Sequence, residues 1–496
     1  MLTCLNSIRS KINQINDSTF HIAIALSIYI IFKCFLPPIG VITRQGMDVL
    51  GVFIFTLYLW TNCSISWPSF MGIGLIGLSG IVTWDEVIKL SWGNWLTPFI
   101  CSCLIINFAM KETGFSRRVA LWFVTRDWVR GKPWFIVTMF LFSCMFLGLF
   151  MSSTPTTVLF MSLAEQILDN TGHKRGEKLC SMLMSCVAWI ATATMGMTPI
   201  SHVLVIMVIG LIGSDFGISI NMLSFTLVGL SVGILFFLCL LLVCKFIIKP
   251  DLTKLKDLDI DAIKRSIPSA SKEEKIVGMI FGSLVLVWIC PDILSCYKLT
   301  ASLGAAVSQI GQTVPAIIAV GLLCIIQVNE KPIISLENAC REISWGSVFM
   351  MAQLMLLGNV VSSEAAGISQ TLSSIIAPIT KNMSPFLFVL TILLFIIVLT
   401  NFINNTTCAL FYTIVAPIAA NIDGLNVIAL SLMIGIIANY GLATPAATTT
   451  TNIVVSSGWV SGSFLWKYGW YLVIITLLAS VFIGYPLAAV LFPNNL

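Results

Sequence analysis

The sequence predicts an all-α polytopic membrane protein, and three observations support that prediction. Of the 496 residues, 57% are hydrophobic and only 10% are charged, whereas soluble globular chains carry about 25% charged residues. Apolar segments long enough to cross a bilayer recur along the chain. The second half also repeats motifs of the first. We therefore expect about 11 transmembrane helices in an inverted-topology repeat, with two re-entrant hairpins and two broken helices.

The chain divides into four parts at its charged stretches. Residues 1–19 are mostly polar and are expected to form a cytoplasmic N-terminal segment. The stretch 249–275 is expected to be a cytoplasmic linker between a first repeat, 20–248, and a second repeat, 276–496. The spans expected in the first repeat are 20–39, 46–62, 67–83, 96–111 and 220–248. Those expected in the second are 276–294, 309–327, 347–362 and 464–491.

In each repeat a run of hydroxyl and amide side chains interrupts an apolar region. These runs are 151–157 and 400–408. An unpaired polar group in hydrocarbon costs several kcal/mol, so a lipid-facing helix would not carry either run. The flanking apolar limbs are 134–150 and 157–169 in the first repeat, and 385–399 and 409–421 in the second. Because the limb 157–169 is too short for a full crossing, each pair is predicted to be a re-entrant hairpin with a polar tip.

Two longer apolar segments are interrupted by Gly, Thr and Pro at mid-membrane depth. The segment 179–213 is interrupted at 193–202, and the segment 426–457 is interrupted at 441–445. Such interruptions predict unwound helices of the kind that form binding sites in secondary transporters. Two amphipathic stretches are expected to lie along the membrane interface: 111–132 and 364–380.

Matching motifs indicate that the two halves arose from one repeat. They occur in the same order in both halves, at offsets between 246 and 253 residues. The pairs are Ser91-Trp92-Gly93 with Ser344-Trp345-Gly346, Gly114-Phe115-Ser116 with Gly367-Ile368-Ser369, Ser152-Ser153-Thr154 with Asn404-Asn405-Thr406, and Thr198-Pro199 with Thr444-Pro445.

The distribution of charge predicts the orientation in the membrane. The stretches 111–132, 174–178 and 249–275 carry six, three and seven Lys or Arg residues, whereas 363–384 carries only Lys381. The positive-inside rule places the first three stretches in the cytoplasm and the last one outside. Counting crossings around re-entrant hairpins satisfies both placements. We therefore expect a multi-pass protein of the plasma membrane, with its N-terminus in the cytoplasm and its C-terminus outside.

The composition argues against several other functions. The apolar segments hold no carboxylate pair, Ser/His/Asp set or metal-ligand spacing, so we expect neither an enzyme nor an organic cofactor. The chain has no long basic run interleaved with aromatic residues, and nucleic acid is not an expected partner. His202 is the histidine that lies deep in the membrane. It could link transport to protons, or it could be a buried histidine satisfied by hydrogen bonds.

Backbone and hydroxyl groups can bind ions without any charged side chain. A broken helix exposes N–H groups where its second half starts and carbonyl groups where its first half ends. These ends carry partial positive and negative charge, so four breaks could bind an anion and a cation together. In Asn404-Asn405-Thr406, amide and hydroxyl donors suit a carboxylate and carbonyl oxygens suit Na⁺. The competing interpretation is that Ser and Thr bond to helix carbonyls and that Asn joins helices.

The paired tips, the break at Ala443-Thr444-Pro445 and the inverted halves resemble the divalent anion:sodium symporter family, whose members carry Ser-Asn-Thr at both tips. The resemblance covers nearly the whole chain from Phe20, and it implies a homodimer with elevator-like alternating access. By resemblance, the residues that bind substrate are Ser153, Thr154, Asn405, Thr406, Thr444 and Pro445. Those that bind Na⁺ are Ser152, Ser153, Gly196, Thr400, Asn404, Asn405 and Ala443.

This chain departs from the family pattern at both tips. Ser153 stands where the family has Asn, Asn404 stands where Ser is usual, and Ala446-Ala447-Thr448 replaces a Pro-Asn run. We predict a secondary active transporter of small anions, with Na⁺-coupled symport of di- or tricarboxylates. Three alternatives stay open: coupling to H⁺, Na⁺-independent anion exchange or oxyanion efflux, and a non-transporting receptor on a degenerate transporter fold.

Overall fold

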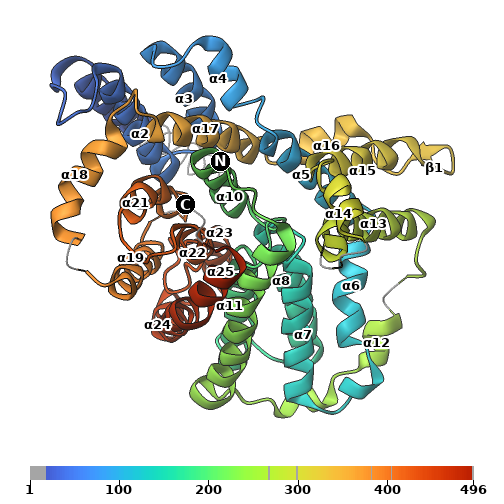
Figure 1. Ribbon diagram of the computed structural model, residues 1–496. Coiled ribbons are helices and arrows are strands. Elements are labelled where there is room, and N and C mark those ends of the chain that lie inside the picture. The colour runs from blue at the N-terminus through green and yellow to red at the C-terminus, as the bar shows by residue number, and fades with distance from the viewer. Residues whose placement is uncertain are drawn as a thin grey trace, which may run out of the picture.

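The structure, a computed structural model, confirms an all-α membrane protein. It describes residues 18–265, 268–295, 297, 300–380, 383–403 and 405–493. The predicted N-terminal segment therefore lies almost wholly outside the described residues. A short antiparallel hairpin, β1 (Gln327–Val328) and β2 (Lys331–Pro332), was not predicted; it projects at one edge of the molecule (Figure 1).

The first half consists of helices in the predicted order. They are Ser18–Phe35, which ends in η1 (Ile31–Phe35), α2 (Arg44–Asn62), α3 (Ser66–Ser79), α4 (Trp84–Leu90), α5 (Leu96–Glu112), α6 (Phe115–Val124), η2 (Asp127–Val129), α7 (Pro133–Gly148), α8 (Ser153–Asn170), α9 (Lys178–Thr194), α10 (Val203–Phe216) and α11 (Met222–Leu242), extended by η3 (Val243–Ile248). The linker holds η4 (Thr253–Asp257) and α12 (Ile260–Arg265).

The second half repeats this order, as the motifs predicted. It comprises α13 (Lys272–Ser295), α14 (Ala301–Ser308), α15 (Thr313–Ile325), α16 (Leu336–Glu342), α17 (Trp345–Ser362), α18 (Ile368–Thr380), α19 (Pro385–Leu399), α20 (Asn405–Leu410), α21 (Tyr412–Ala419), α22 (Val427–Ile437), α23 (Thr449–Ser456), α24 (Gly462–Ala479), η5 (Ser480–Gly484) and α25 (Tyr485–Leu491). Thus α7–α8 and α19–α21 form the two hairpins, while α9–α10 and α22–α23 form the two broken helices.

Five helices are long and apolar enough to cross a membrane by themselves, judged by length and composition among the described residues. They are Ser18–Phe35, Met222–Ile248, Lys272–Ser295, Trp345–Ser362 and Gly462–Leu491. A shorter class of apolar helices includes one limb of each hairpin, α7 and α19, and the half-helices α9, α10 and α22 of the two broken helices. A limb or half-helix of this kind reaches only partway through a bilayer, which fits its place in a hairpin or a broken helix.

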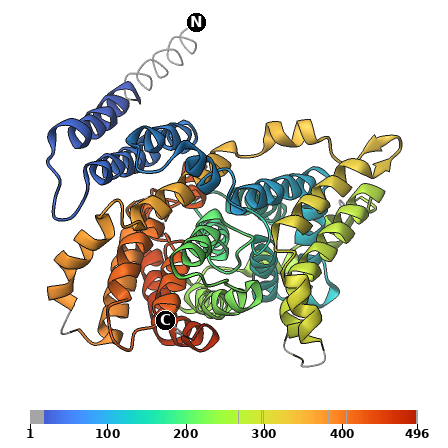
Figure 2. The ribbon, with the colours of Figure 1, turned by 45° about the horizontal axis from the view of Figure 1, so that its top comes forward.

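Several helices of one half pack on helices of the other half. In an outer group, which we call the frame, α17 packs on α3 and α5 packs on α15. Close approach in the frame depends on glycine: Gly72 of α3 faces the Gln353 side chain of α17, and Gly346 faces Ser66. In an inner group, which we call the core unit, α10 packs on α22 and α23 packs on α9. Figures 1 and 2 show α6 and α18 on opposite sides of the molecule. We call the stretches 111–132 and 364–380, which contain these helices, the first and the second arm.

Helix α17 lies between two hydrophobic cores. One side of it, with Met351 and Met355, belongs to the large core around the core unit. The other side, with Leu356 and Val360, belongs to a smaller core formed with the first helices of the chain. Helix α10 of the core unit also packs on α17. Helix α17 therefore provides a main contact of the frame with the core unit.

Three predicted boundaries were wrong. The second limb of the first hairpin starts at Ser153 rather than at 157 and has 18 residues, so Ser153 and Thr154 lie in its first helical turn. Pro155 does not prevent this start, because the first helical turn needs no N–H from a proline. In the second hairpin the helix starts at Asn405 and is interrupted at Phe411. The second break spans 438–448, longer than the predicted 441–445.

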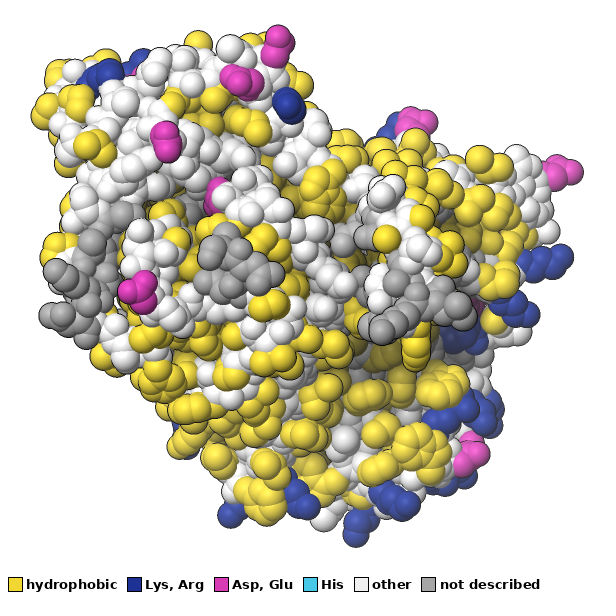
Figure 3. All heavy atoms as spheres, in the orientation of Figure 1, with side chains coloured by type: hydrophobic (Ala, Val, Ile, Leu, Met, Phe, Trp, Pro, Cys, Tyr) yellow, Lys and Arg dark blue, Asp and Glu magenta, His cyan; other side chains and the backbone are white. Residues whose placement is uncertain are grey.

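Basic residues gather along one end of the molecule. Figure 3 shows Lys and Arg along the lower edge, where Figure 1 places α12 and the ends of α6, α7 and α11. Some of them attach the linker and the first arm to neighbouring helices. Arg118 of α6 pairs with Glu274 at the start of α13, and Arg130 pairs with Asp261 of α12 at 2.7 Å. Lys254 lies 3.2 Å from Glu177 in the loop between α8 and α9.

Candidate functional site

A single amide side chain fixes the second hairpin tip to the second break. Asn401 is fully buried, and its Oδ1 accepts the backbone N–H groups of Leu442 at 2.8 Å and Ala443 at 2.7 Å. Its Nδ2 donates to the carbonyl groups of Ile397 and Tyr440. The amide thereby pairs three backbone groups of the buried, unwound segment and one carbonyl group in the last turn of α19.

Beside this amide, three oxygen atoms meet with one proton between them. The Thr400 hydroxyl lies 2.9 Å from Oδ1 of Asn405 and 2.6 Å from the Ala438 carbonyl oxygen. A hydroxyl group donates only one hydrogen bond, and both of these oxygen atoms are acceptors, while the Cys408 thiol also bonds to the Thr400 hydroxyl. Hard cations are bound by such groups of carbonyl, amide and hydroxyl oxygens. The chemistry of these donors therefore fits Na⁺, which would be a transported ion.

The first hairpin tip, 149–152, is attached to the first break by a matching bond. The Thr198 hydroxyl donates to the Leu149 carbonyl at 2.5 Å, as Thr444 donates to the Asn401 carbonyl at 2.5 Å. The break itself is held from within, because the Ser201 hydroxyl bonds to the carbonyl of Thr194 at 2.7 Å. Both tips are thus bound to the break of their own half.

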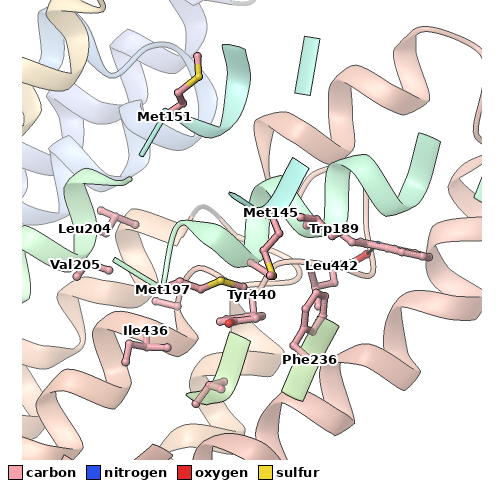
Figure 4. Close-up of a cluster of buried hydrophobic side chains, with 14 of the residues drawn as sticks. Met145, Met151, Trp189, Met197, Leu204, Val205, Phe236, Ile436, Tyr440 and Leu442 are labelled. Carbon is pink, nitrogen blue, oxygen red and sulfur yellow. Dashed lines mark hydrogen bonds between the residues drawn. The ribbon is translucent and has the colours of Figure 1, made fainter. Parts of the chain in front are cut away.

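The two breaks contact each other at the centre of the molecule. A side chain on Gly196 would come within 2.9 Å of the Ile436 carbonyl oxygen and 3.3 Å of the Tyr440 ring. Figure 4 shows Met197, Ile436 and Tyr440 together in this buried cluster. The Trp189 indole also donates to the Leu442 carbonyl at 2.8 Å. The tips are therefore connected through the two breaks.

A glycine on the following helix backs each break. On α11, a Cβ at Gly229 would lie 2.7 Å from the Gly196 carbonyl oxygen. On α24, a Cβ at Gly469 would lie 2.6 Å from Cα of Ala443. Glycine is required where backbone approaches backbone this closely. The same device thus supports the unwound segment of both repeats.

Threonine hydroxyls also join the two broken helices, on α9 and at the start of α23. The Thr192 hydroxyl of α9 lies 2.5 Å from the Thr450 hydroxyl of α23, and Thr448 lies 2.8 Å from Thr450. Thr448 and Thr451 also form the capping box of α23. These groups satisfy one another, so here the structural interpretation of buried hydroxyls holds.

The structure brings together only part of the predicted site. Thr400, Asn405, Ala443 and Thr444 gather around Asn401, whereas the Thr406 hydroxyl faces Sδ of Met350 on the frame at 3.8 Å. The Pro445 ring packs beside Gly462, at the start of α24. In the first half, Ser152 is the N-cap residue of α8 without a side-chain capping bond, Ser153 is buried, Thr154 is exposed, and Gly196 lies in the first break, facing Ile436 and Tyr440. Asn404 lies outside the described residues.

His202 has a structural place in the first broken helix. It is the N-cap of α10, and its Nδ1 accepts the backbone N–H of Leu204 at 3.5 Å. A nitrogen that accepts carries no proton, so the cap uses one of the two ring nitrogens. This placement favours the interpretation of His202 as a hydrogen-bonded buried histidine.

Sequence reasoning missed Asn401 and the Ala438 carbonyl. Asn401 lies inside the polar run 400–408. It is not part of the motif Asn404-Asn405-Thr406, so it was not predicted as a site residue. An amide placed four residues before Asn405 was a signal, because Asn can satisfy the donors and acceptors of unwound backbone. A backbone carbonyl such as that of Ala438 leaves no signal in the sequence.

This geometry agrees with comparisons to known proteins. A family model described as citrate transporter (CitMHS) matches residues 55–406, more than two thirds of the chain. This chain belongs to the citrate transporter family. The family assignment makes the protein a multi-pass membrane transporter, and it confirms the resemblance to the divalent anion:sodium symporters.

Curated relatives of this citrate transporter family member cover most of its length. A sodium-dependent dicarboxylate transporter, SdcS, of Staphylococcus saprophyticus is 24% identical over 90% of this chain and 86% of its own. An uncharacterized transporter of Haemophilus influenzae is 26% identical over 84% of this chain and 91% of its own. Another, of Methanocaldococcus jannaschii, is 27% identical over 67% of this chain and 69% of its own.

Proposed function

We propose that this protein is a Na⁺-coupled symporter of di- or tricarboxylates. The observation that carries the proposal is the oxygen cluster of Thr400, Asn405 and Ala438 with its single proton. A cation there would satisfy the acceptor that this hydroxyl leaves without a donor among the described residues. The sodium-dependent dicarboxylate relative supports the same combination of ion and substrate.

In this proposal the anion binds beside the cation, between the hairpin tips. Asn405 would contact both ions, with Thr444 and Thr406 on the second-repeat side and Ser153 and Thr154 on the first. The start of α8 adds the partial positive charge of a helix N-terminus. Pro445, together with Ser152, Gly196, Asn404 and Ala443, would frame the ions through backbone groups and short side chains.

The proposed cycle is alternating access. The frame would stay fixed while the core unit moves past α17 in an elevator-like way, as in the family that the motifs resemble. We place the protein in the plasma membrane as a homodimer, with its N-terminus cytoplasmic and its C-terminus outside. The basic end that Figure 3 shows would then face the cytoplasm.

Uptake into proteoliposomes tests the proposal. Uptake of radiolabelled succinate or citrate should require external Na⁺, and Asn405→Ala should abolish it while the protein remains folded. Asn421→Ala is the matched control, because the Asn421 amide only bonds to the Pro417 carbonyl at the exposed end of α21. Unchanged uptake with choline in place of Na⁺ would instead favour a Na⁺-independent exchanger.

A further inference from the structure

The matching bonds at the two tips align the repeats residue by residue. Thr198 with Leu149 corresponds to Thr444 with Asn401, because each hydroxyl donates to the carbonyl of its tip at 2.5 Å. One residue before each tip carbonyl, Gly148 therefore corresponds to Thr400. In the same register, Ser153 corresponds to Asn405.

Each side-chain oxygen of the second-repeat cluster can now be compared with its first-repeat position. The counterpart of Thr400 is Gly148, which has no side chain. The counterpart of Asn405 is Ser153, whose shorter side chain lacks the amide oxygen. The first repeat therefore lacks both side-chain oxygens of the second-repeat cluster, the Thr400 hydroxyl and the Asn405 amide oxygen.

The space for a first-repeat ligand is also filled. A Cβ at Gly148 would lie 2.5 Å from Oγ1 and 2.9 Å from Cγ2 of Thr194. Thr194 is fully buried, and its hydroxyl donates to the Ala191 carbonyl at 3.0 Å. The volume that the Thr400 hydroxyl occupies in the second repeat is thus taken in the first repeat by a side chain whose proton is already used.

We infer that this transporter couples each cycle to one Na⁺, bound only in the second repeat at Thr400, Asn405 and Ala438. The inference rests on the proposed Na⁺ coupling. The first repeat then serves the anion alone, through the hydroxyl groups of Ser153 and Thr154. One cation per cycle balances only one of the two charges of a dicarboxylate, so uptake of a dianion would move net negative charge inward.

Binding of Na⁺ alone tests this stoichiometry without knowledge of the substrate. The thermal midpoint of the purified full-length protein would be measured against NaCl, with choline chloride holding the ionic strength constant. A ligand that binds only the folded state at one site adds RT ln(1 + [L]/Kd) to the free energy of unfolding, so well above Kd the stability rises in proportion to ln[Na⁺], and two sites double that rise. Thr400→Val should weaken Na⁺ binding about tenfold or more, and Thr400→Ser should retain it.

The matched control is Thr194→Val, which should leave the affinity for Na⁺ unchanged. A rise with ln[Na⁺] twice as steep as one site predicts, or a Na⁺ affinity that falls in Thr194→Val or Ser153→Ala, would overturn the single-site inference. A wild-type protein that shows no response to Na⁺ would refute the proposed coupling itself, so the two failures are distinguishable. If Thr400→Val does not fold, the Thr194→Val and Ser153→Ala titrations still decide between one site and two.

Discussion

Asn401 and Ala443 are joined by a 2.7 Å hydrogen bond from the backbone of the second break to the side chain of the second hairpin tip. The same oxygen binds the N–H of Leu442, and the Thr444 hydroxyl returns a bond to the Asn401 carbonyl. Tip and break are therefore one rigid body. The Na⁺ ligands that we propose sit on both of its parts, so their spacing depends on this amide.

Replacing Asn401 by alanine should weaken the connection between the second hairpin tip and the second break. Leu442 and Ala443 would keep buried N–H groups without acceptors, which costs at least about 2 kcal/mol of unfolding free energy. We expect a lower thermal midpoint and a weaker response to Na⁺. Thr413→Ala is a control, since the hydroxyl of this buried threonine bonds only within its own helical turn. Full Na⁺ affinity in Asn401→Ala would contradict the role given to the amide.

Alanine at Gly229 or Gly469 should push on the backbone of a break. The added methyl group would lie within 2.7 Å of backbone atoms in both cases, and such overpacking costs about 1–3 kcal/mol. Reduced thermal stability together with reduced uptake is the expected result. Gly74→Ala and Gly282→Ala introduce the same methyl group where nothing lies within 4 Å. Equal losses in all four variants would show that the breaks are not specially sensitive.

Acidification should destabilise the loop between α8 and α9 through His173. Burial lowers the pKa of His173 below its ordinary value of 6.5, and Lys254 adds to this, although Glu177 and Asp251 oppose it. Because the folded-state pKa is depressed, the neutral ring contributes stability that is present above pH 6.5 and is lost as the pH falls through the folded-state pKa.

Thermal unfolding at several pH values measures this effect. The midpoint of the wild type should fall more steeply below about pH 6.5 than that of His173→Gln, which has no titrating ring. Glu177 has a lowered pKa of its own, because the Lys174 N–H and Lys254 bind it. That contribution is shared by both proteins. Parallel pH profiles would therefore contradict the assignment to His173.

The two ion pairs of the first arm should differ in their effect on stability. Arg118 pairs with Glu274, whose side chain is 7% exposed, whereas Arg130 and Asp261 are each 53% exposed. Arg118→Met should cost about 2 kcal/mol by leaving a buried carboxylate without its partner. Arg130→Met should cost below about 1 kcal/mol. Urea unfolding of both variants in the same detergent compares them directly.

Much of this architecture was predictable from the sequence, because its causes are local. Hydropathy located the long spans, and Gly, Thr and Pro at mid-membrane depth located both breaks. The repeated motifs gave the order of elements in the second half. The start of α8 was misplaced because Ser152 and Ser153 suit both a tip and a helix cap. Residue type alone does not distinguish the two.

The site was less predictable, because its contacts join distant parts of the chain. Thr400, Asn405 and Ala443 were predicted from motifs. The hydrogen bond between Asn401 and the second break joins residues about forty positions apart, and the oxygen cluster includes the backbone carbonyl of Ala438. The filling of the first-repeat position by Thr194 depends on a contact with Gly148 across two helices. Such contacts are set by packing and leave no local pattern.

The exchange of helices between the halves bears on how the protein is made. During synthesis the first half enters the membrane while α15, α17 and α22, the partners of α5, α3 and α10, are still untranslated. The helix surfaces at Gly72 and Gly210 of the first half then face lipid or other proteins instead of the side chains of Gln353 and Met355. A nascent chain in this condition must be protected from premature association and proteolysis. Ribosome stalling or truncation within the linker would therefore yield a species for membrane quality control rather than a half-transporter.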